Sequence, residues 1–83
     1  MLHALKTEIG YFQEVVDGIK TFEVRKNDRP FQVSDDLVLQ EWNAEDKKYT
    51  GREWKGKIIH ILANERFCKK GYCILGIKEK EDY

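Results

Sequence analysis

The sequence has 83 residues, of which 41% are apolar and 36% charged, and its formal net charge at pH 7 is zero. A chain of this length buries only about 60% of the surface that its unfolded form exposes, so we expect one domain over residues 1–83 with a single core. The composition excludes a disordered chain. The zero net charge excludes attraction of nucleic acid by the overall field, so any such binding must be local.

No segment has the features of a membrane span or an export signal. The longest apolar runs, "IIHIL" and "LVL", have the length of strands, and the first residues lack the basic and long apolar regions of a signal peptide. We therefore expect a cytoplasmic protein without membrane contact, in which Cys68 and Cys73 stay reduced.

The N-terminal part of the chain predicts a strand followed by a helix. The strand is "LHAL" at 2–5, and the helix is predicted over 8–17, where apolar residues recur three and seven positions after Ile9. Thr7 is expected to cap the N-terminus of this helix, and Gly18 stands where a left-handed residue would end it.

Residues 20–26 show the period of two that is typical of a strand. Phe22 and Val24 face one way and are expected in the core. Glu23 and Arg25 share the opposite face, within reach of a salt bridge or of a common ligand. "NDRP" then ends the strand, because Asn and Asp favour turns and Pro lacks a backbone donor.

Three more strands are predicted over 36–42, 49–63 and 72–78. The second of these is long, and Gly51 and Gly56 suggest a bulge or a sharp bend of the kind that closes a barrel. We expect a mostly β (α+β) chain, a small β-barrel of five to six strands with one N-terminal helix packed over one opening. The expected core residues are Phe22, Val24, Leu37, Leu39, Ile59, Ile61, Ile74 and Leu75.

Four side chains are of the types that bind zinc: His3, His60, Cys68 and Cys73. A structural zinc site normally uses close pairs such as C-x2-C, whereas "CKKGYC" is C-x4-C and the two histidines are far apart in the sequence. We therefore expect no metal and no cofactor. Nucleophilic catalysis is also disfavoured, since the only serine, Ser34, lies in a predicted turn and His60 lies in an apolar strand.

The charged stretch "GIKTFEVRKNDR" at 18–29 allows two interpretations. Charges on an edge strand commonly do no more than prevent a small sheet from pairing with its neighbours. Here the strand is expected to be anchored by its apolar residues, and its charges combine with Asp28 and Arg29 of the turn into one dense patch. We therefore favour a site.

At these residues the sequence resembles the activating-signal-cointegrator homology (ASCH) domain, whose signature G-x-K-x-x-E-x-R is matched by "GIKTFEVR". The blocks "HALK", "YTGR", "IIHIL" and "GYCILGI" extend the likeness in order over nearly the whole chain, which is similar to short bacterial and phage proteins of that superfamily. The resemblance implies a PUA-like β-barrel with a cleft between the helix and the signature strand, and a role in RNA binding or in processing a modified nucleoside. The signature positions are Gly18, Lys20, Glu23 and Arg25.

The function favoured here is a binding module for RNA or a nucleotide. Lys20 and Arg25 would contact phosphate or a base edge, and Glu23 would orient Arg25 or accept from a base amino group. Since Arg25 lies on the polar face of a strand, Arg25→Ala is expected to change stability by no more than about 1 kcal/mol. We expect a monomer. The remaining expected ligand-binding residues are Lys26, Arg29, Arg52 and His3.

The alternative is an enzyme. Some small ASCH proteins are amidohydrolases that remove the acetyl group from a modified cytidine such as N4-acetylcytidine, with a Lys at the position of Lys20, a Thr at that of Glu23 and a later Glu. In such an enzyme Lys20 would activate water or the amide, and Glu23 would move the proton. The sequence departs from this pattern at Glu23, at the later Glu, which has no definite counterpart, and at Ser34, where relatives usually have Gly. A regulatory or host-interaction protein with a vestigial cleft is a third reading.

Overall fold

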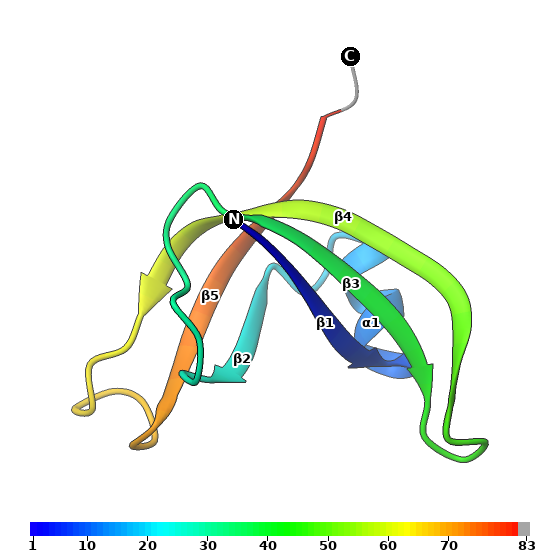
Figure 1. Cartoon of the computed structure of the whole chain (residues 1–83), viewed down its shortest axis with the longest axis horizontal. Coiled ribbons are helices and arrows are strands. Elements are labelled where there is room, and N and C mark those ends of the chain that lie inside the picture. The colour runs from blue at the N-terminus through cyan, green and yellow to red at the C-terminus, as the bar shows by residue number, and fades with distance from the viewer. Residues whose placement is uncertain (82–83) are drawn as a thin grey trace.

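The computed structural model describes residues 1–81, which form one helix and five strands (Figure 1). The elements begin and end within a few residues of the segments that the sequence predicts. Their bounds are β1 Leu2–Glu8, α1 Ile9–Val16, β2 Phe22–Lys26, β3 Asp36–Asn43, β4 Lys48–Leu62 and β5 Tyr72–Glu79.

The five strands form one sheet in the order β1-β3-β4-β5-β2. β1 runs parallel to β3, and all other neighbours are antiparallel. The sheet curls into a half-barrel, and α1 packs against β1 and β3 (Figure 1). The prediction of a mostly β chain with one short helix is confirmed. The barrel is not closed by strand pairing within residues 1–81, because β1 and β2 are the two edges of the sheet.

Helix α1 contributes Phe12 and Val15 to the core. It ends as the sequence predicts: Gly18 has a φ of 75° and donates its N–H to the Val15 carbonyl oxygen at 3.0 Å. The predicted N-cap is wrong, because Thr7 still belongs to β1 and the cap position is taken by Glu8, which makes no side-chain capping bond. Thr7 is buried instead.

The core lies on the concave face of the sheet, where β1, β3, β4 and β5 bury alternate residues, and Leu37, Leu39 and Leu75 are buried there as expected. The expectation for β2 is wrong. Glu23 pairs with the buried Leu75 and is itself only 3% exposed, so the polar residues of β2 face inward. Phe22 and Val24 lie on the outer face, about half exposed.

Two bulges in β4 shift its alternation. The first surrounds Gly51, which has a φ of 94°, as the predicted bend requires. The second inserts one extra residue, Ile59, opposite the step from Ile77 to Gly76. Ile58 is therefore buried and Ile59 is 55% exposed, which corrects the predicted core position of Ile59.

Two further expected core residues, Ile61 and Ile74, are only partly buried. Ile61 is partly buried and packs against the core. Ile74 pairs with Val24 and alternates with the buried Leu75, so it belongs to the outer face and is only partly covered. Among residues 1–81 no helix is long and apolar enough to cross a membrane.

Candidate functional site

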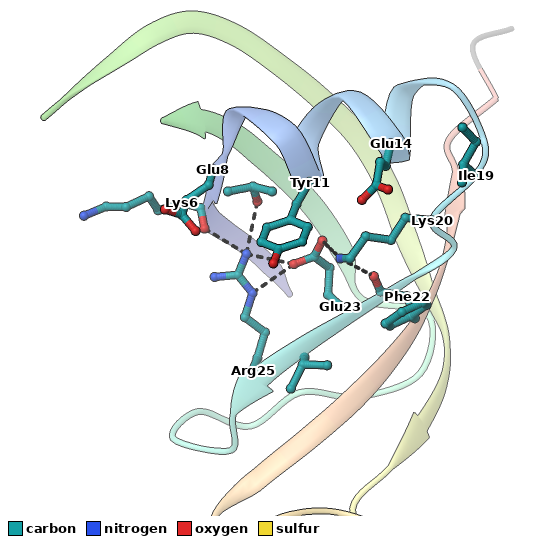
Figure 2. Close-up of a pocket in the computed structure, with 11 residues that line it drawn as sticks. Lys6, Glu8, Tyr11, Glu14, Ile19, Lys20, Phe22, Glu23 and Arg25 are labelled. Carbon is teal, nitrogen blue, oxygen red and sulfur yellow. Dashed lines mark hydrogen bonds and ion pairs between the residues drawn. The ribbon is translucent and has the colours of Figure 1, made fainter. Parts of the chain in front are cut away.

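A concave region lies between α1, the end of β1 and the edge strand β2 (Figure 2). Its volume is about 650 Å³, within the range of small-molecule sites. Four consecutive residues of β2, 22–25, line it, so the pocket receives side chains from both faces of this strand. It therefore wraps around the free edge of β2.

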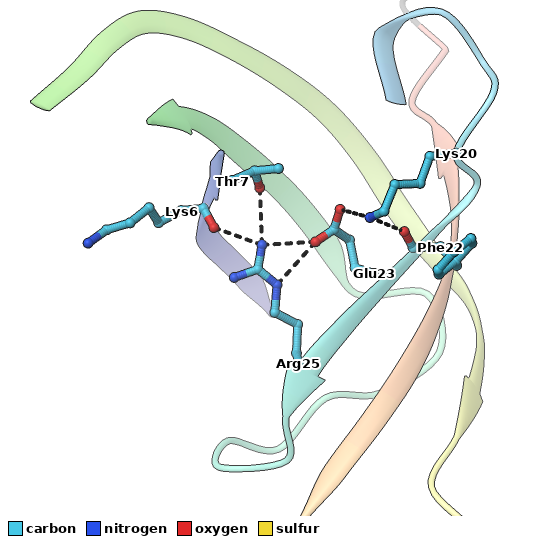
Figure 3. Close-up of polar contacts among 6 residues, drawn as sticks. All are labelled: Lys6, Thr7, Lys20, Phe22, Glu23 and Arg25. Carbon is cyan, nitrogen blue, oxygen red and sulfur yellow. Dashed lines mark hydrogen bonds and ion pairs between the residues drawn. The ribbon is translucent and has the colours of Figure 1, made fainter. Parts of the chain in front are cut away.

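Glu23 is the centre of the polar wall of this pocket (Figure 3). Its Oε1 accepts from Lys20 Nζ at 2.8 Å, and its Oε2 accepts from Arg25 Nη2 at 2.9 Å and Nε at 3.2 Å. The Glu23 side chain is only 4% exposed, so water cannot solvate its carboxylate. The three hydrogen bonds from Lys20 and Arg25 take the place of that water. The three charged signature residues thus form one connected cluster.

Arg25 also links the two edges of the half-barrel. Its Nη2 donates to the Lys6 carbonyl oxygen at 2.8 Å and to the Thr7 hydroxyl at 3.0 Å, both on β1 (Figure 3). No other hydrogen bond joins β1 to β2 among residues 1–81. The seam between the edges is therefore held by one guanidinium group.

Aromatic rings form the apolar walls. Tyr11 of α1 and Phe22 of β2 lie on either side of Lys20, whose Nζ is 5.7 Å and 5.0 Å from the two ring centroids (Figure 2). Ile19 and Val24 extend these walls. Lys20 Nζ also donates to the Phe22 carbonyl oxygen at 2.7 Å, which fixes the ammonium group between the rings.

Charged groups of both signs balance around the pocket. It is lined by three basic and three acidic residues, and the ammonium group of one of them, Lys6, points away from the pocket and lies 4.1 Å from the ring centroid of Trp42, so it is not an electropositive cleft (Figure 2). They are Lys6, Lys20, Arg25, Glu8, Glu14 and Glu23.

The structure places the other expected ligand-binding residues outside this pocket. Lys26 and Arg29 lie beside Arg25 at a smaller hollow of about 200 Å³. Gly18 ends α1 without lining the pocket. His3 is buried against Phe31, and its Nε2 donates to Asp35 Oδ2 at 2.7 Å.

Arg52 belongs to a separate cluster with Gln13 and Glu41. Its Nη1 donates to Glu41 Oε2 at 3.3 Å and to Gln13 Oε1 at 3.1 Å, and Thr50 donates its hydroxyl to Glu41 Oε1 at 2.6 Å. Glu41 pairs with Thr7 in the β1–β3 register, so Thr7 lies between the two buried carboxylate clusters.

Two pKa values depart clearly from their usual range, and both belong to groups outside the pocket. The pKa of Asp35 is lowered to about 2, chiefly by the hydrogen bond from His3 and also by the N-terminal amine and the Gln32 N–H. Burial raises the pKa of the Cys73 thiol. Within residues 1–81 no three His, Cys, Asp or Glu side chains are grouped to hold a metal ion.

Sequence reasoning missed several residues of the pocket: Lys6, Thr7, Tyr11, Glu14 and Ile19. The sequence predicts Thr7 as a helix cap, which does not place it at the pocket. The alternation of His3, Leu5 and Thr7, which are all buried, was the signal that β1 continues to the pocket.

The sequence profile of the family described as "Domain of unknown function (DUF3850)" matches residues 2–77. The chain is also similar to the uncharacterised 12.9 kDa protein in the GpA 3′ region of Escherichia phage P2, with 35% identity over 60 residues. The aligned region covers 72% of this chain and 53% of that relative, so the chain spans about half of the phage protein's length.

Proposed function

The chain belongs to the DUF3850 family, and we propose that its pocket between α1 and β2 binds one nucleoside, either free or as a unit of RNA. We also propose that the half-barrel is of the PUA-like ASCH type. The support for this second point is the resemblance of "GIKTFEVR" to the signature, together with the contact of Lys20, Glu23 and Arg25 in one cluster.

The observation that carries the proposal is the combination of two exposed rings with a fixed polar wall. Tyr11 is 55% and Phe22 45% exposed, although both line a concave site. Single nucleotides are recognised by stacking on such rings and by hydrogen bonds to the base edges. The pocket offers both kinds of contact, at a volume within the range of small-molecule sites.

The free edge of β2 supplies main-chain groups for a base edge. In the β2–β5 ladder, Ile77 donates to the Thr21 carbonyl oxygen and Asn27 donates to the Gly71 carbonyl oxygen. Because the residues of an antiparallel strand alternate between its two sides, the N–H and C=O of Val24 point away from β5, toward the free edge. One donor and one acceptor at Val24 suit the paired donor and acceptor of a base.

The charged residues of the pocket hold a few hydrogen-bond donors in fixed positions for the ligand. Glu23 fixes Lys20 and Arg25, and Arg25 directs Nη2 to β1, which leaves its Nη1 without a bond to the described residues. Nη1 and the third proton of Lys20 Nζ are the donors that remain for a base carbonyl or a phosphate. The balanced charge of the pocket favours a nucleoside over a polyphosphate.

Equilibrium binding of the four ribonucleosides and their 5′-monophosphates tests this proposal. Tyr11→Ala should weaken nucleoside binding by about fivefold or more, since one stacked base contributes about 1–3 kcal/mol. Tyr49→Ala is the matched control, because Tyr49 is also half exposed but does not line the pocket. Absence of nucleoside binding, or equal effects of the two substitutions, would contradict the proposal.

A second candidate is hydrolysis of an acylated nucleoside such as N4-acetylcytidine. It is favoured by one observation: Lys20 and Glu23, the residues at the catalytic positions of the resembling amidohydrolases, are in direct contact at the pocket wall. Water would add to the amide carbonyl, the C–N bond would break, and acetate and cytidine would leave, with Glu23 passing the proton to the amine. Release of cytidine that Lys20→Met abolishes supports the enzyme. Binding without release supports the module.

A further inference from the structure

The loop of residues 63–71, which joins β4 to β5, forms a second groove beside β2. We call it the loop groove. It has a volume of about 330 Å³ and is lined by Val24, Phe67, Cys68, Lys69, Tyr72 and Ile74. Asn27 donates its N–H to the Gly71 carbonyl oxygen at 2.9 Å, so the loop is fixed against the end of β2.

One exposed ring, one partly buried ring and two cations lie in or beside this groove. Phe67 is 68% exposed, and the Arg66 guanidinium lies 5.6 Å from its ring centroid. Lys69 Nζ lies 5.2 Å from the ring centroid of Tyr72. Residues 64–71 carry three cations against the single carboxylate of Glu65, although the whole chain is neutral. Flat exposed rings beside local positive charge are the features by which proteins hold single-stranded nucleic acid.

The loop groove adjoins the pocket described above. Val24 lines both regions. On the outer face of the sheet Val24 pairs with Ile74, and the next pair on that face is Lys26 with Tyr72. The two concave regions therefore share one lining side chain, so a single strand can pass from one to the other. Lys26 pairs with Tyr72 and Lys69 lines the loop groove, so both cations lie next to this groove.

We infer that the loop groove binds the nucleotide next to the one in the pocket, so that the ligand is a single strand of RNA rather than a free nucleoside. The inference rests on the proposed function of the pocket. The next base stacks on Phe67 and Tyr72, and its phosphate is held by Lys26 and Lys69. The excess of cations over carboxylates in residues 64–71 favours a polyanionic strand over a protein segment.

The test compares a mixed-sequence single-stranded RNA pentamer with the four nucleosides, on wild type, Phe67→Ala and Lys69→Ala. The pentamer should bind wild type more tightly than any nucleoside. Phe67→Ala should weaken pentamer binding about fivefold or more and leave nucleoside binding unchanged, because one stacking platform is lost. Lys69→Ala should lower the slope of log affinity against log salt by about one.

Tyr49→Ala and Lys48→Ala serve as controls, since both residues are exposed at the start of β4, outside the loop groove. Circular dichroism of every variant checks the fold. A pentamer that binds wild type no more tightly than a nucleoside, or equally to wild type and Phe67→Ala, overturns the inference. So does Phe67-dependent binding to vesicles of phosphatidylserine without binding to RNA.

The two proposals fail separately. Nucleoside binding that depends on Tyr11, combined with a pentamer affinity unaffected by Phe67→Ala, refutes the loop groove alone. Pentamer binding that depends on Phe67 but not on Tyr11, with no nucleoside binding, refutes the pocket and keeps the loop groove as a strand-binding surface. No binding of any probe refutes both.

Discussion

Replacing Arg25 with alanine is expected to destabilise the protein by about 3 kcal/mol, well above the limit of about 1 kcal/mol that its sequence position suggests. The Arg25 side chain is only 22% exposed, and it donates two hydrogen bonds to the buried Glu23. A hydrogen bond to a charged group contributes about 1.5–3 kcal/mol, and removing one partner leaves the carboxylate poorly paired. The bonds to Lys6 and Thr7, which hold the seam between the sheet edges, are lost as well.

Urea unfolding followed by tryptophan fluorescence measures this effect, because Trp54 lies in the core. Arg29→Ala is the control: its side chain is 41% exposed and lies 3.9 Å from Asp28, so its removal should change the unfolding free energy by less than about 0.5 kcal/mol. The double variant Arg25→Ala with Glu23→Gln should lose much less stability than the sum of the losses in the two single variants, since both residues belong to one network.

The reasoning about the seam is refuted if Arg25→Ala and Arg29→Ala are equally stable. In that case Arg25 would be a solvated side chain, and the contacts across the edges would contribute nothing to stability. If the effects of Arg25→Ala and Glu23→Gln simply add, the idea that Arg25 and Glu23 belong to one network is refuted instead.

Three further predictions concern the rest of the fold. Ser34 has a φ of 80°, so Ser34→Gly should raise the unfolding free energy by up to about 1 kcal/mol in urea titrations, and Ser34→Ala should not. Because the folded pKa of Asp35 is depressed from 3.8 to about 2, its ionised form stabilises the fold above pH 4, and this contribution should disappear as the pH falls toward 2; thermal unfolding of Asp35→Asn should lack the corresponding pH dependence. Cys73 is buried with a raised pKa, so a thiol reagent should label Cys68 well before Cys73, and equal rates would contradict the buried position.

Most element boundaries could be read from the sequence because they depend on local signals, but the end of β1 could not. Period-two alternation, the glycine that ends α1 and the turn residues after β2 each act within a few positions. Which side chains of β2 point into the core depends on contacts between side chains. Phe22 and Val24 are better core residues than Glu23 by transfer energy alone, and only the donors contributed by Lys20 and Arg25 make the opposite orientation stable.

The candidate site was predictable only in part for the same reason. Lys20, Glu23 and Arg25 are close in sequence, so their grouping followed from strand geometry. Tyr11 and Thr7 reach the pocket because the sheet curls and brings its first edge opposite β2. Arg52 has only its charge to mark it in the sequence, and the fold pairs it with Glu41, outside the pocket. The bulge at Ile59, which reverses the alternation of β4, has no sequence marker such as glycine.

The strand order also bears on how the chain acquires its structure. β3, β4 and β5 are joined in sequence as antiparallel neighbours, whereas β1 pairs with β3 and β2 with β5 across long separations, as in Leu2 with Asp36 and Phe22 with Gly76. We expect the local meander to form first and the N-terminal segment to dock on both its edges late, since distant pairings must overcome more loop entropy. The pocket is then completed in the last step of folding. Substitutions at Arg25 should accordingly speed unfolding and leave the refolding rate nearly unchanged.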